Sequence, residues 1–404
     1  MPRPLDPSPV HMPLPAARIA IVGAGLSGLV AAMLLEQQGR HDFVLFEARD
    51  ALGGRIASVD ATGSTVDCAA QALDRFDLGP SWFWPDCQPQ LDRLGDELGL
   101  QRLEQFEQGD MLFERAANEP PMRMQGYASS PASMRWVGGT AALIGAIQRR
   151  LDSRRLLVGR TVRRVRHARS HLEIDSVDAS GQSASWRAEH LLLALPPRLA
   201  AGSVDFEPAL PPELAREWRA TPTWMAPHAK YVAIYDTPFW RDHGLSGTAQ
   251  SAHGPLVEIH DLSMPGGHAA LFGFLGVPAR VRRQVPQAEL RAHCRAQLGR
   301  LFGPRAAAPV ADALKDWAAD PLTATEQDQD AAGHHAEAPS SGAAGGPWHA
   351  RLTGIGSEWS PRFPGYLAGA VDAAVRGVHQ ALEALAKPMQ PDAQGCRRAD
   401  GSRS

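Results

Sequence analysis

The sequence predicts an α/β fold that begins with a parallel-sheet domain and has enough further chain for a second domain. The first observation is a strand–helix–strand unit: residues 18–22 form a buried strand, residues 26–38 a helix and residues 43–46 the next strand. The second is length, because 404 residues supply two or three domains. The third is an alternation of apolar and polar residues over 156–193, which predicts a β-meander that ends in a buried strand.

The other elements follow from periodicity in chain order. Residues 92–106 form a charged stretch with helical spacing, and residues 140–151 predict a helix that begins behind two glycines. Further along, the sequence predicts strands over 230–236 and 269–277, a helix over 287–302, a mobile polar surface loop over 323–347, and a closing alanine-rich helix over 364–385.

Composition and charge exclude several functions. The net charge of −3 provides no basic field that would attract nucleic acid or an acidic membrane. No apolar run reaches the roughly 18 residues of a membrane helix, and residues 1–17 lack the pattern of a signal peptide, so we expect a cytoplasmic protein. Residues 1–17 and 388–404 are expected to be disordered. The sequence does not decide whether the protein forms a homo-oligomer.

No metal site is expected. The four cysteines are widely spaced, which argues against a disulfide framework and against structural zinc. His334 and His335 lie close to Asp330, but no third ligand stands at a suitable spacing, so a solvated loop is the simpler interpretation.

Lysine is scarce. Of the 41 basic residues, only Lys230, Lys315 and Lys387 are lysines. A biased genome explains most of this scarcity, since most surface positions accept either base. A lysine that remains in such a background is a candidate for a role that arginine cannot fill, because the pKa of its compact ammonium shifts readily on burial.

A glycine-rich motif connects the first strand to the first helix. The motif reads Gly23-Ala24-Gly25-Leu26-Ser27-Gly28 and fits G-x-G-x-x-G. Glycines at these positions allow a tight turn and let a pyrophosphate approach the helix N-terminus. Glu47 ends the next strand at the expected distance and can accept hydrogen bonds from ribose hydroxyls. The unit therefore predicts a Rossmann-like dinucleotide site.

Further motifs resemble a known family. Asp50-Ala51-Leu52-Gly53-Gly54-Arg55 resembles the segment that crosses the flavin phosphates in flavoproteins of the glutathione-reductase type. From about residue 18 to residue 385, the chain resembles the flavin-containing amine oxidases, which include monoamine, polyamine and L-amino-acid oxidases. The motifs that carry this resemblance are Asp77-Leu78-Gly79-Pro80-Ser81-Trp82, Arg135-Trp136-Val137-Gly138-Gly139-Thr140, Leu192-Leu193-Ala194-Leu195-Pro196-Pro197, Pro238-Phe239-Trp240-Arg241, and Gly356-Ser357-Glu358 with Gly365-Tyr366-Leu367-Ala368-Gly369-Ala370.

The resemblance implies a Rossmann-like FAD-binding domain of the glutathione-reductase type with an inserted α+β substrate-binding domain. Some relatives carry a flavin-bonded cysteine at the place that corresponds to residues 326–327, where this chain has none, so noncovalent FAD is expected. The residues implied to contact FAD are Gly23, Gly25, Leu26, Ser27, Gly28, Glu47, Ala48, Arg49, Gly53, Gly54, Arg55, Gly79, Pro80, Ser81, Trp82, Val162, Gly356, Ser357, Glu358, Gly365, Tyr366, Leu367 and Ala370.

The resemblance also implies a catalytic site. Its implied members are Lys230, Trp82, Trp317 and Tyr366. In the family, a lysine eight residues before a segment such as 238–241 holds a water beside flavin N5, and Lys230 stands at that place. From the residues alone, a surface lysine on a strand is the alternative interpretation of Lys230, and ordinary core packing is the alternative for the aromatic residues. Lys315 and Lys387 lack such a context, and we expect them to be solvated.

The implied reaction is the oxidation of an amine or amino acid. A hydride would pass from the carbon beside the amine to flavin N5, the imine would hydrolyse, and O2 would reoxidise the flavin and give H2O2. The implied partners are thus a small amine-like molecule and O2. The domain expectation is an FAD-binding domain over 18–85, 135–205 and 345–387, and a substrate domain over 86–134 and 206–344.

Two departures from the family leave alternatives open. No aromatic residue stands near residues 326–327, so the aromatic cage for the substrate amine would have Tyr366 on one side only. Only 55 residues separate Trp82 from Gly138, which indicates a reduced substrate lobe, as in renalase. The alternatives are a flavin dehydrogenase or desaturase, a renalase-like oxidase of a non-amine, and a flavin-binding scaffold with little turnover.

Overall fold

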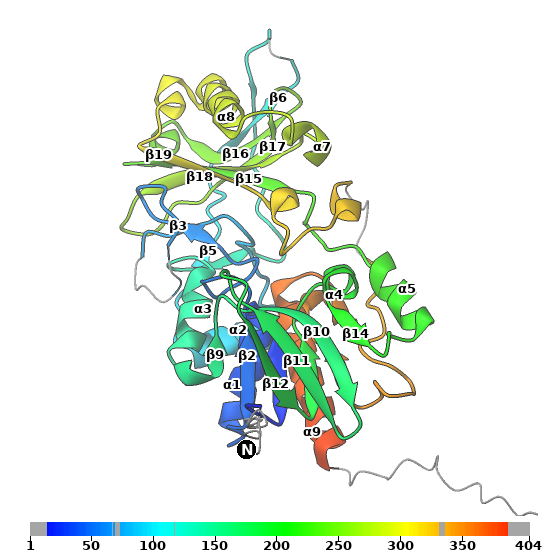
Figure 1. Ribbon diagram of the computed structural model, residues 1–404. Helices are drawn as coiled ribbons and strands as arrows, with labels where there is room; N and C mark the ends of the chain where they lie inside the picture. Colours follow the sequence, from blue (N-terminus) through cyan, green and yellow to red (C-terminus); the bar gives the residue numbers. More distant parts are fainter. Residues whose placement is uncertain (1–13, 67, 69–72, 117, 331–335, 387–404) are drawn as a thin grey trace, which may run out of the picture.

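The protein has two lobes (Figure 1). The computed structural model describes residues 14–66, 68, 73–116, 118–330 and 336–386. The predicted disorder over 1–13 and 388–404 lies outside these residues. Residues 14–17 differ from that prediction, because Ala17 is buried and its backbone N–H donates to the Arg187 carbonyl at 2.9 Å.

A five-stranded parallel sheet forms the centre of the lower lobe in Figure 1. Its strands lie in the order β20 (Leu352–Gly354), β13 (His190–Leu193), β1 (Ile19–Val22), β2 (Phe43–Phe46) and β9 (Leu156–Leu157). The predicted strand–helix–strand unit is confirmed as β1, α1 (Leu26–Gln37) and β2. Every residue of β1 and β2 is buried, as in a sheet that is covered on both faces.

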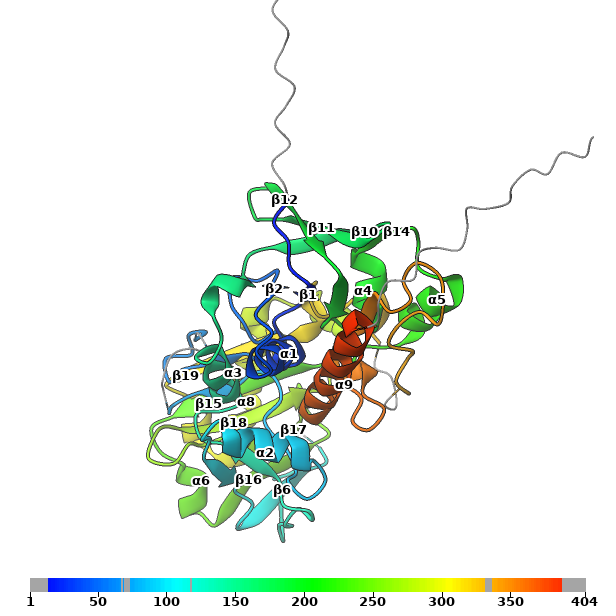
Figure 2. The ribbon, with the colours of Figure 1, turned by 90° about the horizontal axis from the view of Figure 1, so that it is seen from below.

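Helices cover one face of this sheet and a second sheet covers the other. The helical layer consists of α1, α3 (Ala141–Gln148) and α9 (Leu367–Ala386), and Figure 2 shows α1 beside α9. The four-stranded sheet has the order β12 (Ser183–Ala188), β11 (His171–Val177), β10 (Thr161–Ala168) and β14 (Asp205–Glu207). Strands β10 to β12 confirm the predicted meander.

The upper lobe is built on a seven-stranded sheet. Its order is β19 (Ala311–Asp316), β15 (Ala229–Tyr235), β18 (Ala269–Leu275), β17 (Leu256–Asp261), β16 (Leu245–Ser251), β6 (Asp110–Glu114) and β7 (Met122–Met124). Helix α8 (Gln287–Phe302), predicted with the same bounds, covers the outer face. Along β15, Tyr231 and Ala233 face this helix, so the alternation of a strand turns Lys230 and Val232 toward the lower lobe.

The remaining helices and strands are short. They are β3 (Ser58–Val59), β4 (Phe76–Asp77), α2 (Pro89–Glu97), β5 (Arg102–Glu104), β8 (Met134–Trp136), α4 (Pro197–Ser203), α5 (Pro212–Ala220), α6 (Phe239–Asp242) and α7 (Ala279–Arg282).

The predicted helix over residues 92–106 is wrong in its second half. Helix α2 ends just before Gly99, whose φ of +72° suits glycine and stops the helix. Residues 102–104 instead form β5, which pairs antiparallel with β8. The apolar residues of this stretch therefore serve two different elements, which a single helical period cannot show.

The predicted mobile surface loop over 323–347 is wrong for its first part. Thr323 and Asp328 are buried, and Arg198 Nη1 donates to Asp328 Oδ1 at 2.6 Å. The polar composition misleads because these polar groups pair with each other instead of with water. Residues 331–335 lie outside the described residues.

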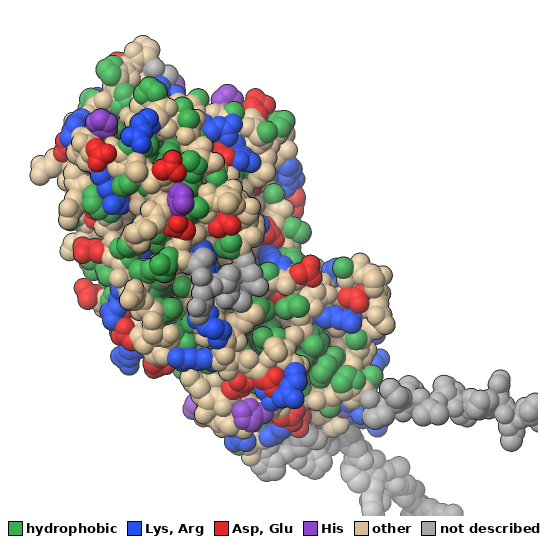
Figure 3. All heavy atoms as spheres, turned by 90° about the vertical axis from the view of Figure 1, so that its left-hand side faces the viewer, with side chains coloured by type: hydrophobic (Ala, Val, Ile, Leu, Met, Phe, Trp, Pro, Cys, Tyr) green, Lys and Arg blue, Asp and Glu red, His purple; other side chains and the backbone are tan. Residues whose placement is uncertain are grey.

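The predicted boundary at residue 205 assigns α5 to the substrate domain, but α5 packs on the lower lobe. Helix α5 follows the predicted boundary at residue 205, yet its Trp218 packs into the core of the lower lobe, and Trp218 Nε1 donates to the Ser340 carbonyl at 2.8 Å. The other boundaries stay predictions. Within the described ranges, no helix is long and apolar enough to cross a membrane. Basic and acidic side chains are interspersed on the face shown in Figure 3, in keeping with the small net charge.

Candidate active site

The turn from β1 to α1 has the geometry of a phosphate cradle. Gly23 adopts φ of +103°, and a Cβ there would lie 2.7 Å from the Ala194 carbonyl oxygen. A Cβ on Gly28 would lie 1.9 Å from the Gly23 carbonyl oxygen. Both positions require glycine, because no side chain fits in these spaces. The turn thereby leaves the N-terminus of α1, with its unpaired N–H groups, facing a cavity.

Glu47 closes the strand beside this turn. One of its carboxylate oxygens accepts from Ala24 N at 2.7 Å and the other from Arg49 N at 2.9 Å. These two bonds fix the carboxylate at the edge of the cavity, where a ribose would lie in a dinucleotide bound to the turn.

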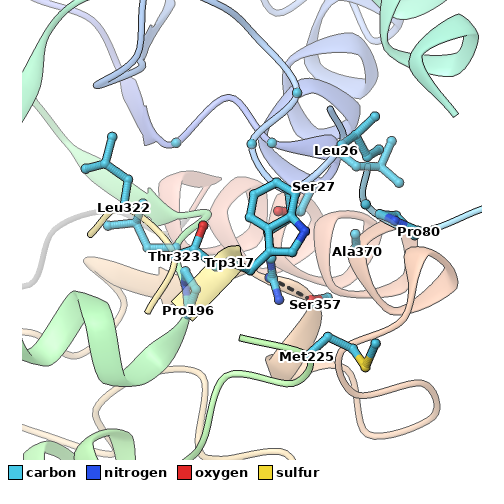
Figure 4. A pocket seen from close by; sticks show the side chains of 18 of the residues that line it. Leu26, Ser27, Pro80, Pro196, Met225, Trp317, Leu322, Thr323, Ser357 and Ala370 are labelled. Carbon is cyan, nitrogen blue, oxygen red and sulfur yellow. Dashed lines mark hydrogen bonds between the residues drawn. The ribbon is translucent and has the colours of Figure 1, made fainter. Parts of the chain in front are cut away.

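The cavity has a volume of about 610 Å³ and passes from the glycine turn into the space between the lobes. It collects residues from β1, β2, β10, β15, β18, β17 and α9, which are far apart in the sequence. The predicted residues that line it are Gly23, Gly25, Leu26, Ser27, Glu47, Ala48, Arg49, Gly53, Gly54, Arg55, Gly79, Pro80, Ser81, Trp82, Val162, Lys230, Trp317, Ser357, Gly365, Tyr366, Leu367 and Ala370. Figure 4 shows Trp317 inside the cavity, between Leu322 and Pro80.

Three predicted cofactor residues do not line the cavity. Gly28 packs against the glycine turn, and Gly356 packs against the Leu195 carbonyl, which a Cβ would approach to 2.6 Å. Glu358 is buried and turned toward Arg55, which donates to its Oε2 at 3.0 Å. These residues shape the cavity wall, and Arg55 itself lines the cavity.

The cavity end next to the upper lobe is aromatic. Trp82 and Trp317 are anchored by their indole N–H groups, which donate to Gln105 Oε1 at 2.8 Å and to the Leu78 carbonyl at 3.0 Å. Tyr366 meets Trp84 edge to face, with ring centroids 6.3 Å apart. Fixed aromatic faces of this kind favour an apolar or cationic ligand.

Sequence reasoning missed several residues of this end. They are Trp84, Trp224, Met225, His228, Glu258, Phe272 and Phe274. Phe272 and Phe274 stand two residues apart on β18 and so share one face of the sheet, a signal that was present in the predicted strand. Trp84 and Trp224 belong to no recognised motif, so only the fold could place them.

Lys230 lies at the boundary between the two lobes and is buried. Its Nζ donates to Ser81 Oγ at 2.7 Å and to the Gly79 carbonyl at 3.0 Å, and lies 4.0 Å from the centre of the Phe272 ring. Burial lowers the pKa of Lys230 from its usual value to about 7. The side chain can therefore hold or release a proton near neutral pH.

The prediction that Lys315 is solvated holds only in part, because its side chain is 30% exposed and also has fixed partners. Lys315 stands opposite Lys230 in the β15–β19 ladder, and its Nζ donates to Asp320 Oδ2 at 2.7 Å and lies 4.5 Å from the centre of the Trp317 ring. The Asp320 carboxylate and the face of the Trp317 ring take the place of part of the water around its ammonium group. Lys387 lies outside the described residues.

Glu258 is the acidic side chain at the aromatic end of the cavity. Its Oε1 lies 2.6 Å from His260 Nε2. This hydrogen bond is the main cause of a lowered pKa of Glu258, so the carboxylate is anionic at neutral pH. The other acidic residue of the cavity wall, Glu47, belongs to the nucleotide end.

Among the described residues, no group of three or more His, Cys, Asp or Glu side chains is placed to bind a metal ion. His334 and His335, considered above, lie outside these residues.

The fold and the cavity together define a class: an oxidoreductase that binds a flavin dinucleotide in a Rossmann-like domain. A glycine turn at a helix N-terminus, a carboxylate beside it and a cavity that continues from the turn to aromatic side chains fit FAD.

Comparison with known proteins defines the family. The family model described as flavin containing amine oxidoreductase matches residues 122–382, and the model of the NAD(P)-binding Rossmann-like domain matches residues 21–98. The chain therefore belongs to the flavin-containing amine oxidoreductases. It is an FAD-dependent enzyme that oxidises amines, which confirms the predicted family, fold class and cofactor.

Individual relatives agree with this assignment. Putrescine oxidase of Kocuria rosea is 24% identical over 380 residues, which cover 66% of this chain and 76% of that protein. The putative flavin-containing monoamine oxidase AofH of Mycobacterium tuberculosis is 32% identical over 178 residues, but the match spans only 36% of its length.

Solved structures share the fold. The structure of putrescine oxidase bound to putrescine superposes with a TM-score of 0.72 at 20% identity, over 92% of this chain and 100% of that chain. Cyclohexylamine oxidase from Brevibacterium oxydans IH-35A gives a TM-score of 0.73, also at 20% identity and over 92% of this chain and 100% of that chain.

Proposed function

We propose that this protein is an amine oxidase that uses noncovalent FAD and returns the electrons to O2 as H2O2. The observation that carries the proposal is Lys230, a buried amine whose Nζ is held at the wall of an aromatic cavity by Gly79 and Ser81. When bound, FAD supplies the ring that accepts a hydride from the substrate and later reacts with O2. Trp82, Trp317 and Tyr366 hold the substrate carbon in place and exclude water.

Lys230→Met tests the role of this side chain. The substitution removes a proton and a positive charge from the cavity wall, so we expect reoxidation of the reduced enzyme by O2 to slow by about tenfold or more, while FAD content stays unchanged. Stopped-flow absorbance after mixing with O2 measures the rate. Arg283→Met, which replaces an exposed basic residue just after α7, is the control and should keep the wild-type rate. An unchanged O2 reaction in Lys230→Met removes Lys230 from the mechanism.

The noncovalent attachment has its own support. No cysteine occurs among the described residues 317–330, the segment that lines the cavity with Trp317, Pro321, Leu322 and Thr323. Acid precipitation should therefore release all of the yellow colour into the supernatant. The described cysteines Cys87 and Cys294 are free thiols, which supports a reducing, cytoplasmic location.

Glu258 supports a particular class of amine. The Glu258 carboxylate is partly exposed at this end of the cavity, and besides its hydrogen bond with His260 it can attract a second positive charge on the substrate. A short diamine would place one amine at the ring and the other at Glu258. This feature favours the substrate named for putrescine oxidase over the single-amine substrate named for cyclohexylamine oxidase.

Glu258→Gln separates these two classes. We expect the kcat/KM for diamines to fall by about tenfold to a hundredfold, since a charge-assisted hydrogen bond contributes roughly 1.5–3 kcal/mol. The kcat/KM for a monoamine of the same length should fall little or rise. Glu289→Gln, an exposed glutamate on α8, is the matched control. Equal losses for both substrates would contradict the assignment of Glu258.

A further inference from the structure

Lys230 depends on one short segment for its position. Both acceptors of its Nζ, the Gly79 carbonyl and Ser81 Oγ, belong to residues 77–81, which begin at the last residue of β4 and continue along the cavity wall over 78–81. These acceptors are neutral, and the Phe272 ring covers another side of the ammonium. A buried positive charge with neutral partners is unfavourable unless a carboxylate lies near it.

Asp77 begins this segment and is completely buried. Its Oδ1 accepts hydrogen bonds from Thr140 N at 2.9 Å, Thr140 Oγ1 at 2.8 Å and Ser58 Oγ at 3.2 Å. Burial raises the pKa of Asp77, and the Lys230 ammonium and the three donors on its Oδ1 oppose this rise and hold the side chain in place. Its Oδ2 has no hydrogen-bond partner among the described residues, so no cationic side chain there forms a hydrogen-bonded ion pair with this oxygen.

Arg135 is a second buried cation near the same place. Its Nη2 donates to the Ser263 carbonyl at 2.9 Å, while Nε and Nη1 have no partner within the part of the chain that the structure describes. The three charges influence each other through space. Burial is the largest influence on Lys230 and lowers its pKa, Asp77 raises that pKa, and Arg135 lowers it.

The other charged side chains on the described strands around β15 have partners of their own. These pairs are Lys315 with Asp320, Asp312 with Arg291 and Arg295, Asp316 with Arg282, Glu258 with His260, and Asp261 with Arg241. Asp77 is the carboxylate whose charge remains available to Lys230, because its hydrogen bonds come from a backbone amide and two neutral hydroxyls.

We propose that Asp77 is a positioning residue for amine oxidation. Its carboxylate is the counter-charge that lets Lys230 carry a proton inside the cavity, and Arg135 is the opposing cation that makes this proton easier to release. Asp77 touches neither substrate nor FAD; it acts through the electrostatic field and through the segment that holds Lys230. This inference rests on the proposed role of Lys230.

The scarcity of lysine allows a direct test in the FAD-loaded protein. With lysine labelled at Cε with ¹³C, the spectrum contains signals from only three lysines, and the Lys230 signal is assigned by its loss in Lys230→Met. In the wild type, we expect this signal to titrate with a midpoint at about 7. In Asp77→Asn, the midpoint should fall by about one pH unit or more. Asp372→Asn, which replaces a buried aspartate on α9, is the matched control and should leave the midpoint in place.

Arg135→Met gives the opposite shift. Removal of the opposing cation should move the Lys230 midpoint to higher pH, and this variant keeps the test decisive if Asp77→Asn does not fold. A second readout, the pH midpoint of flavin reoxidation by O2, should move in the same direction as the Lys230 signal in each variant. An unchanged Lys230 titration in folded Asp77→Asn, or an unchanged or lower midpoint in Arg135→Met, overturns the proposal. Failure of amines to reduce the flavin would contradict the proposed function instead, and would leave the titration result standing.

Discussion

At the scale of single residues, the glycine turn shows how a motif becomes a binding site. Gly28 does not line the cavity, yet the turn depends on it because any side chain would collide with the Gly23 carbonyl. The motif therefore contains two kinds of glycine. Gly23 and Gly25 face the ligand, and Gly28 lets the helix pack closely on the strand.

Gly28→Ala tests this division. The added methyl group would lie 1.9 Å from the Gly23 carbonyl oxygen, so the turn must open and the phosphate cradle is lost. We expect FAD affinity to fall by about tenfold or more, that is by at least roughly 1.4 kcal/mol, as measured by titration of the apoprotein with FAD. Gly202→Ala, where a Cβ meets open space, should bind FAD normally. Normal FAD binding by Gly28→Ala would refute the packing role.

The glycine turn and Glu47 could be predicted from the residues because each stands at a fixed distance from a recognisable strand or helix, whereas Lys230 could be selected only through the resemblance to the family. All of them line the cavity, and their roles stay predictions. Glu258 and Trp224 could not be predicted, since a single Glu or Trp on a strand or loop carries no information about which cavity it will face.

At the scale of elements, alternation along strands decides what reaches the site. Strand β15 turns Tyr231 toward α8 and Lys230 toward the cavity, and β18 presents Phe272 and Phe274 on the same side. The strands were predictable from their apolar residues. The face that each strand turns to the cavity was not, because it depends on which elements cover the sheet.

The junction of β13 with β20 contains a buried titratable group that makes stability depend on pH. His190 Nδ1 lies 3.1 Å from the Ala350 carbonyl and its Nε2 lies 3.0 Å from Thr353 Oγ1. Burial lowers the pKa of His190 to about 4, so the folded protein holds the ring neutral while the unfolded chain takes up a proton below its ordinary value. The contribution of neutral His190 to the free energy of unfolding is therefore fully present above about pH 6.5, and it is lost as the pH falls toward 4.

His190→Asn should remove this acid sensitivity. We expect the wild type to lose at most about 3 kcal/mol between pH 6.5 and 4 through this group, and the variant to lose correspondingly less over the same window. Urea unfolding at several pH values measures the difference. His379→Asn, an exposed histidine on α9, should retain the wild-type slope. Parallel pH profiles for the wild type and His190→Asn would contradict the assignment.

At the scale of the whole molecule, the active site exists only because three sheets and the last helix meet. The glycine turn lies in the parallel sheet, Val162 in the four-stranded sheet, Lys230 in the seven-stranded sheet and Ala370 in α9. Sequence order could suggest that these segments belong together only through resemblance to a family. Local patterns alone, as with the buried Thr323 and Asp328 in an apparently loop-like stretch, do not reveal such long-range contacts.

The combined account makes one central claim: amines reduce an FAD held in this cavity. Anaerobic mixing of the purified holoenzyme with a panel of monoamines, short diamines and amino acids tests it, with the flavin absorbance as readout. We predict that the yellow colour bleaches with amines, and fastest with a short diamine that can span from the ring to Glu258. A flavin that stays oxidised with every amine in the panel would contradict the claim.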